Sequence, residues 1–141
     1  MAPWLLAAGL LLAACGTQSL SSAMSAWSTG SDLKGALGQL TTDSRQVLAA
    51  LDQSHASAAQ LHTVCAVLDV ETLQANASLP TPDDQTTNLL SRAYTLLGDA
   101  ANVCYHAAGS AAKMTRVRSY LSQAGAVMSE AWLRSQALTS P

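Results

Sequence analysis

Two cysteines and two histidines are the residues of this chain best suited to form a single chemical site. His62 and Cys65 are three positions apart, so on a helix both side chains lie on the same face. Cys104 and His106 are two positions apart, and residues at that spacing diverge by about 200° on a regular helix. The set contains the usual ligands of zinc or copper, but its spacing does not bring all four side chains to one ion. We therefore favour a disulfide between the two cysteines and predict no metal or other cofactor.

The third cysteine, Cys15, ends a segment with the features of a secretory leader. An apolar run from Trp4 to Ala14 leads directly into Cys15, and positions 12–15 read Leu-Ala-Ala-Cys. An apolar run that closes in small residues is typical of a signal peptide, and a cysteine at that point is the lipobox of bacterial lipoproteins. As a helix the run would reach roughly 16 Å, far short of the roughly 30 Å hydrocarbon core of a bilayer. We predict that residues 1–14 are a lipoprotein signal peptide and that Cys15 is the lipid attachment site.

This interpretation places the mature protein outside the cytoplasm, anchored through Cys15 to the membrane of the cell envelope. The segment Met1-Ala2-Pro3 carries no Lys or Arg, which departs from the usual leader pattern. A plain signal peptide with a chance cysteine therefore stays open as the alternative. Residues 15–31 are then the lipidated cysteine and a Ser- and Thr-rich tether. A helix could begin within this tether, because apolar residues recur there at helical spacing.

Export also favours a covalent bond between Cys65 and Cys104. An even pair of cysteines in an oxidising compartment is typical of a disulfide, and both residues fall on apolar stripes that we expect to face the core. The bond would close a loop of roughly 40 residues and contribute roughly 4 kcal/mol in the chain-entropy model. The alternative is two free buried thiols that pack as small apolar groups.

The composition favours one small domain with a tightly packed core. Charged residues make up 11% of the 141 residues, against about 25% in typical soluble domains. The net charge of −2 gives no electrostatic footprint for nucleic acid. The chain has no Phe and only 4% aromatic residues, so the core must use Leu, Val, Ala and Met. We expect close helix packing rather than a roomy, aromatic-lined pocket.

Apolar residues alternate at spacings of three and four through most of the chain, which is the pattern of amphipathic helices. The stripes run from Leu33 to Leu51, on through Leu68, from Leu90 to Ala108, and from Met114 to Leu138. Strict polar–apolar alternation over strand length is absent from the sequence. We therefore predict an all-α protein, an antiparallel up-down bundle of four helices over residues 32–138.

The helix boundaries differ in how clearly the sequence marks them. Between the second and third helices, Leu-Pro-Thr-Pro-Asp-Asp at 79–84 predicts Thr81 as the cap and Pro82 as the first helical residue. Gly109 should end the third helix and Ser110 should cap the fourth. The first junction is weak, and we place a turn at 52–54, with one unbroken helix over 32–76 as the alternative.

Several of these features occur together in one known group of proteins. They are the lipobox at 12–15, a mid-chain Cys65, the 79–83 hinge, and Ala-Tyr-Thr-Leu-Leu at 93–97 followed by Ala-Ala-Asn-Val-Cys at 100–104. The combination resembles the small, Ala-rich lipoproteins of uncharacterised function found in high-GC Gram-positive bacteria. The resemblance implies a secreted helical bundle with one disulfide. It brings no catalytic or binding residue to carry over.

Two further groups of polar residues invite a functional interpretation. His55, His62 and Asp69 recur every seven residues, so they should share one solvated face of the second helix. The last helix is basic and could meet anionic lipid headgroups, although we favour neutralisation by acidic neighbours or solvent. Its cationic residues are Lys113, Arg116, Arg118 and Arg134.

The sequence contains no recognisable catalytic motif, whether a nucleophile elbow, a phosphate-binding loop or a metalloprotease helix. We therefore expect no enzyme activity and predict a membrane-tethered binding module that acts by contact with an envelope protein. The alternative is a carrier that binds a small ligand or a metal between its helices. Neither hypothesis includes a nucleic-acid partner.

Overall fold

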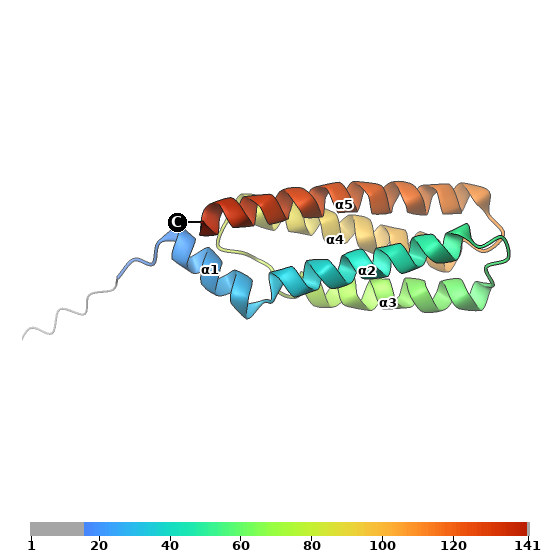
Figure 1. Ribbon diagram of the computed structural model, residues 1–141, viewed down its shortest axis with the longest axis horizontal. Coiled ribbons are helices and arrows are strands. Elements are labelled where there is room, and N and C mark those ends of the chain that lie inside the picture. Colours follow the sequence, from blue (N-terminus) through green and yellow to red (C-terminus); the bar gives the residue numbers. More distant parts are fainter. Residues whose placement is uncertain (1–15, 141) are drawn as a thin grey trace, which may run out of the picture.

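The computed structural model describes residues 16–140, which form five α-helices and no strand. The helices are α1 (Leu20–Gly30), α2 (Leu33–Asp52), α3 (Ala58–Asn76), α4 (Asp84–Tyr105) and α5 (Ala111–Thr139). Figure 1 shows α2 to α5 lying along one long axis, with their connections at alternating ends. The expected all-α class is confirmed. The described part of the chain has five helices where we expected four, because α1 precedes the predicted bundle region of 32–138.

Helix α1 packs against the bundle although its sequence lies within the expected tether of residues 15–31. Ser19 caps it by accepting a hydrogen bond from the Ser22 amide at 3.1 Å. Met24 is fully buried, and the Trp27 indole Nε1 donates to the Ser78 carbonyl at 3.0 Å. These contacts hold α1 beside α5 at the end where α5 finishes (Figure 1). The packed part of the protein therefore begins at Leu20 rather than at residue 32. The predicted lipid site, Cys15, lies outside the described residues.

The turn between α2 and α3 lies where the sequence predicted it. Helix α2 ends at Asp52 and α3 begins at Ala58. Ser57 and Gln60 form a capping box, in which the Gln60 amide donates to Ser57 Oγ at 3.1 Å and the Ser57 amide donates to Gln60 Oε1 at 3.3 Å. This reciprocal pair satisfies two amide donors at the helix start. The alternative of one unbroken helix over 32–76 is therefore wrong.

The start of α4 differs from the prediction by two residues. Asp83, not Thr81, is the cap, because its carboxylate accepts the Thr86 amide at 2.8 Å. The Thr81 hydroxyl instead folds onto the backbone of Asp83, donating to its carbonyl at 2.7 Å. Pro82 consequently precedes the helix, whose first residue is Asp84. A carboxylate outcompetes a hydroxyl here because it is a stronger acceptor and complements the positive helix end.

At the connection between α4 and α5, the expected cap of α5 is confirmed, and α4 is shorter than we expected. Ser110 caps α5, as predicted, and accepts the Lys113 amide at 3.3 Å. Helix α4 ends at Tyr105, three residues before the expected Ala108. The following turn includes Gly109 at φ 74°, a left-handed conformation that glycine adopts without a Cβ penalty. This turn also buries Ala107 completely, which continues the core beyond the helix.

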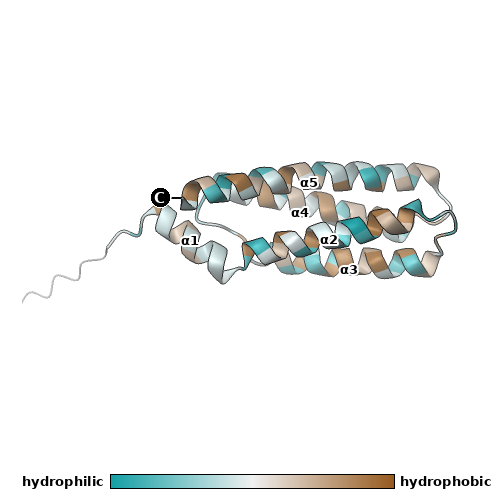
Figure 2. Ribbon diagram, in the orientation of Figure 1, coloured by the Kyte–Doolittle hydropathy of each residue, from teal (hydrophilic) through white to brown (hydrophobic). Residues whose placement is uncertain are grey.

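The predicted disulfide between Cys65 and Cys104 is present in the core. It joins α3 to α4 across a Cα–Cα distance of 5.8 Å, and both cysteines are buried, at 1% and 0% exposure. Around it the core is made of Leu, Ala and Val side chains, as the composition required. Figure 2 shows apolar and polar residues alternating along α2 and α5, as expected for helices with one buried side.

Removing the disulfide should destabilise the protein without changing its fold. The Cys65→Ala/Cys104→Ala double variant should lose roughly 4 kcal/mol of unfolding free energy in the chain-entropy model, within a general range of about 0–5 kcal/mol. Urea denaturation followed by circular dichroism would measure the loss. The wild-type protein treated with reductant should lose a similar amount. If both were as stable as the oxidised protein, the crosslink would not contribute to stability.

A second long-range link joins the start of α4 to α5. The Asp83 carboxylate accepts Arg134 Nε at 2.7 Å and Arg134 Nη2 at 2.8 Å, and it also accepts the Thr86 hydroxyl at 2.7 Å. Asp83 is buried, whereas the Arg134 side chain is 32% exposed. Hydrogen bonds from Arg134, followed by those from Thr86, hold the pKa of Asp83 well below its ordinary value of 3.8 despite burial.

We expect the Asp83→Ala variant to be less stable by about 1–2 kcal/mol at pH 7, because it loses the α4 cap. Since the pKa of Asp83 is lower in the folded than in the unfolded chain, its stabilisation is complete above pH 3.8 and is lost as the pH falls toward the native pKa. The stability gap between wild type and Asp83→Ala should therefore be smaller at pH 3 than at pH 7. A gap that is constant with pH in urea titrations would contradict this account.

Candidate functional site

The four residues considered for a metal site lie close together, but the structure uses them differently. The sulfurs of Cys65 and Cys104 are bonded to each other, so neither is a thiolate ligand. His62 stacks on Tyr105 with ring centroids 3.9 Å apart and planes 5° apart. His106 meets the edge of the same tyrosine at 5.3 Å. Within residues 16–140, no three His, Cys, Asp or Glu side chains gather as a metal would require.

The proposed strip of His55, His62 and Asp69 does not form a single helix face. His55 lies in the turn before α3, which begins at Ala58, so only His62 and Asp69 belong to that helix. The prediction was wrong because the capping box at Ser57 starts a new helix and breaks the seven-residue period.

The basic residues of α5 are partly neutralised, as we favoured. Arg134 binds Asp83, and Arg118 Nη2 donates to Asp52 Oδ1 at 2.8 Å. Lys113 Nζ donates to the His106 carbonyl at 3.1 Å. Arg116 takes part in neither of the ion pairs found within the described residues. These side chains therefore do not form one cationic patch on α5.

A groove lies between α2 and α5. Its volume is about 850 Å³, within the range of roughly 300–1,000 Å³ that is usual for small-molecule sites. The lining comes from these two helices alone. It comprises Lys34, Leu37, Gly38, Thr41, Ser44, Arg45 and Leu48 of α2, and Arg118, Leu121, Ser122, Gly125, Met128, Ser129 and Trp132 of α5. The composition did not predict this groove, whose lining has one aromatic residue, Trp132.

The groove exists because small side chains lie along facing sides of the two helices. A Cβ atom added at Gly38 or at Gly125 would meet no atom within 4 Å, so both glycines border open space. Ser and Thr supply most of the remaining small positions. Helix α2 consequently contacts α5 much less than α4 does. Aliphatic and small side chains, rather than aromatic ones, make this hollow.

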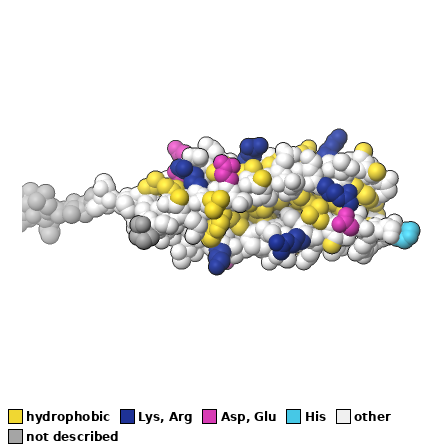
Figure 3. Space-filling view, turned by 45° about the horizontal axis from the view of Figure 1, so that its top comes forward, with side chains coloured by type: hydrophobic (Ala, Val, Ile, Leu, Met, Phe, Trp, Pro, Cys, Tyr) yellow, Lys and Arg dark blue, Asp and Glu magenta, His cyan; other side chains and the backbone are white. Residues whose placement is uncertain are grey.

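The floor of the groove is apolar and continuous with the core. Leu37, Leu121 and Met128 are 8%, 5% and 6% exposed, and Trp132 is half-buried at one end of the lining. Figure 3 shows hydrophobic side chains along the strip between the two helices, with Lys and Arg side chains beside them. Such a surface can hold an apolar group against a dry floor while water reaches its rim.

Two hydroxyl groups of the groove differ in whether they have a hydrogen-bond partner. The Thr41 hydroxyl donates to the Leu37 carbonyl at 2.8 Å, within its own helix. The Ser44 hydroxyl is buried and has no hydrogen-bond partner. A buried polar group without a partner is unfavourable by about 1–3 kcal/mol, so Ser44 would gain from an acceptor placed beside it.

A second exposed apolar feature lies on the outer side of α3. Val67, Val70 and Leu73 are 41%, 50% and 63% exposed. These residues recur every third position, so they lie along one side of the helix. They form a flat face rather than a hollow, and we refer to these three residues as the α3 face.

Comparisons with known proteins bring no homologue. The chain matches no protein-family model, and no curated protein or solved structure is similar to it at a significant level. None of its described helices is long and apolar enough to cross a membrane.

The two glycines of the groove give a direct test of its geometry. Gly38→Ala and Gly125→Ala should each raise the unfolding free energy by about 0.5–1 kcal/mol, because alanine favours a helix interior and its Cβ enters open space. Gly109→Ala is the matched control, and it should lower stability because of its positive φ. Thermal denaturation of the three variants would show these opposite signs. Destabilisation by Gly38→Ala or Gly125→Ala would mean that the space is filled.

Proposed function

We propose that this protein is a membrane-anchored, non-enzymatic binding module of the cell envelope, with a small-ligand site in the α2–α5 groove. Helices α2 to α5 are taken as an antiparallel up-down four-helix bundle, to which α1 adds a short fifth helix. Cys15 is the proposed point of lipid attachment after removal of residues 1–14. The observation that carries the binding role is the groove of about 850 Å³ with an apolar floor.

This choice favours the carrier hypothesis over pure contact with a partner protein. Small molecules bind in concave, mostly apolar hollows with a few polar groups, and the groove has these features. Protein partners need a broad surface, and interfaces below about 1,000 Å² of buried area are usually weak. The α3 face consists of three exposed side chains. It supports contact with an envelope protein as a second candidate function of the same anchored domain.

The test of the ligand site uses the chain from Gly16 onward, which contains all five helices, the disulfide and every residue of the hydrophobic core. The neutral fluorophore N-phenyl-1-naphthylamine should bind it, with energy transfer from Trp132, which lies in the groove. Gly125→Leu should weaken this binding at least roughly tenfold, since the added side chain occupies the groove, which corresponds to about 1.4 kcal/mol.

Gly98→Leu is the matched control for that substitution. Gly98 lies within α4, has open space at its Cβ position, and is not among the groove residues. It should leave probe binding unchanged while altering helix propensity in the same direction as Gly125→Leu. Equal binding by wild type and Gly125→Leu, with both proteins folded, would exclude the groove as the site.

The proposed lipid anchor at Cys15 can be tested in cells by lipid labelling and membrane sedimentation. The full chain expressed in a bacterial host should incorporate labelled palmitate and sediment with membranes. Cys15→Ser should do neither, whereas Cys65→Ser should retain the label because that cysteine lies in the core. If Cys15→Ser still carried the label, lipid would be attached elsewhere. Loss of the label with unchanged membrane sedimentation would indicate an uncleaved leader instead of a lipid anchor.

A further inference from the structure

The charged residues that line the α2–α5 groove are all cations. Lys34, Arg45 and Arg118 line it, and no carboxylate stands among the described residues of its lining. The chain has 7 Lys and Arg residues against 9 Asp and Glu residues, so a random lining would carry more acid than base. Three of the seven cations instead border a single hollow on a protein with net charge −2. This bias gives the groove a positive rim above an apolar floor.

Two of these cations do not belong to the ion pairs of the described residues. Those pairs are Arg118 with Asp52 and Arg134 with Asp83, so Lys34 and Arg45 are in neither. The Arg118–Asp52 pair is solvated, with side chains 41% and 70% exposed. Exposed pairs of this kind contribute about 0–1 kcal/mol. Arg118 Nη2 also donates to the Leu51 carbonyl at 3.3 Å, and the other guanidinium donors of Arg118 are available to a ligand anion.

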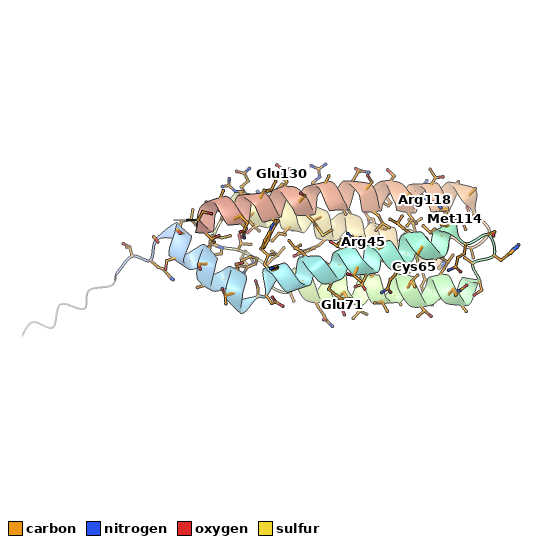
Figure 4. All side chains as sticks on the ribbon, viewed as in Figure 1. Arg45, Cys65, Glu71, Met114, Arg118 and Glu130 are labelled. Atoms are coloured by element: carbon orange, nitrogen blue, oxygen red, sulfur yellow. A yellow bond between two sulfur atoms is a disulfide. The ribbon has the colours of Figure 1, made fainter. Side chains whose placement is uncertain are left out.

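Two of the carboxylates lie away from the groove. Figure 4 shows Glu130 on the side of α5 away from α2, and Glu71 on the far side of α3. Asp52 is the last residue of α2 and already contacts Arg118. The rim would therefore attract an anion rather than a cation or a neutral polar group.

The positions of the cations also suggest an orientation. Arg45 and Arg118 come from opposite helices in the half of the bundle that ends at the α2–α3 and α4–α5 turns (Figure 4). Guanidinium groups bind carboxylate or phosphate with paired hydrogen bonds. The unpartnered Ser44 hydroxyl is adjacent to Arg45 in sequence and lines the same groove. These groups together form the polar end of the site.

From Lys34 to Leu48 the groove follows α2 for about 21 Å, taken from the helix rise of about 1.5 Å per residue. Its apolar floor runs from the Arg45 and Arg118 half toward Trp132 and the end of α5. This length suits one extended alkyl chain. A planar membrane surface could not reach the floor between two helices.

We propose that the α2–α5 groove binds a single-chain anionic amphiphile as a monomer, with its headgroup at Arg45 and Arg118 and its alkyl chain along Leu121 and Met128. This inference rests on the proposed ligand site and adds the chemical class of the ligand. Affinity comes from burial of the chain at about 25 cal/mol per Å². Selectivity comes from the cationic rim.

The experiment compares two amphiphiles that share one palmitoyl-glycerol unit and differ by a phosphate group. Monopalmitoyl phosphatidic acid has one chain and a phosphate, and monopalmitin has the same chain without charge. Displacement of N-phenyl-1-naphthylamine from the chain starting at Gly16 measures both affinities, below the micelle concentration of each lipid. The anionic lipid should bind at least roughly tenfold more tightly at low salt, because charge-assisted hydrogen bonds contribute about 1.5–3 kcal/mol. Added salt should reduce the difference.

Two charge-reversal variants locate the effect. Arg45→Glu should weaken binding of the anionic lipid much more than binding of monopalmitin, and so remove the preference. Arg116→Glu is the matched control, because Arg116 is an exposed cation of α5 outside the groove lining. It should keep the preference. An equal effect of both variants would indicate general surface electrostatics and overturn the inference.

The remaining outcomes separate this inference from the proposed function. If the two lipids bind equally in the groove, the ligand site stands and the anionic class is wrong. Binding of neither lipid, together with no binding of the fluorophore, would remove the ligand site itself. Binding to vesicles of anionic phospholipid without binding of the monomer would assign the cations to a membrane surface and overturn the inference.

Discussion

Close approach of helices through alanine is the constraint on which the rest of this structure depends. Helix α4 buries Ala93, Ala100 and Ala101 at 0–2% exposure, and α5 buries Ala124 and Ala131 completely. Small side chains let α4 lie close to α5 on one side and to α3 on the other. The disulfide then fixes α3 to α4. Helices α3, α4 and α5 thus form the closed part of the bundle, and α2 covers it with larger side chains.

This asymmetry explains why a hollow of about 850 Å³ lies between α2 and α5. Side-chain hydrogen bonds stabilise both ends of helix α2. At its start, Asp32 caps the helix at φ 47° and accepts the Gly35 amide at 3.2 Å. At its end, Arg118 donates to the Leu51 carbonyl at 3.3 Å and to Asp52. Between these ends, glycine and serine face α5, so no side chain closes the gap.

The sequence predicted what depends on local periodicity and composition. The apolar stripes located α2 to α5, and the polar gap at residues 52–54 located the first turn. The cysteine count and the expectation of export predicted the disulfide. Local signals did not identify Asp83 as the α4 cap, because its capping role is coupled to Arg134, 51 positions away. Packing of α1 likewise depends on Trp27 reaching Ser78, a contact that no local pattern specifies.

The groove was missed for a different reason. Composition describes the average core, and a core of Leu, Val and Ala does suit close packing. The groove depends on where small residues stand, beside the apolar stripes of α2 and α5. These residues are Gly38, Thr41, Ser122 and Gly125. They indicate a groove only once α2 and α5 are known to be neighbours, and the sequence alone does not establish which helices of a bundle are neighbours.

Several residues that border the hollow are not the most stabilising choices for a helix. A glycine in a helix interior is less stable than alanine by about 0.5–1 kcal/mol, and Gly38 and Gly125 have room for a Cβ. Ser44 adds a buried hydroxyl without a partner. In a domain with a modest core, these are avoidable losses, and all three border one groove with a cationic rim. Where a sequence departs from local stability at several neighbouring positions, function is the usual cause. Binding of an amphiphile would recover part of the loss by covering the apolar floor and giving Ser44 an acceptor.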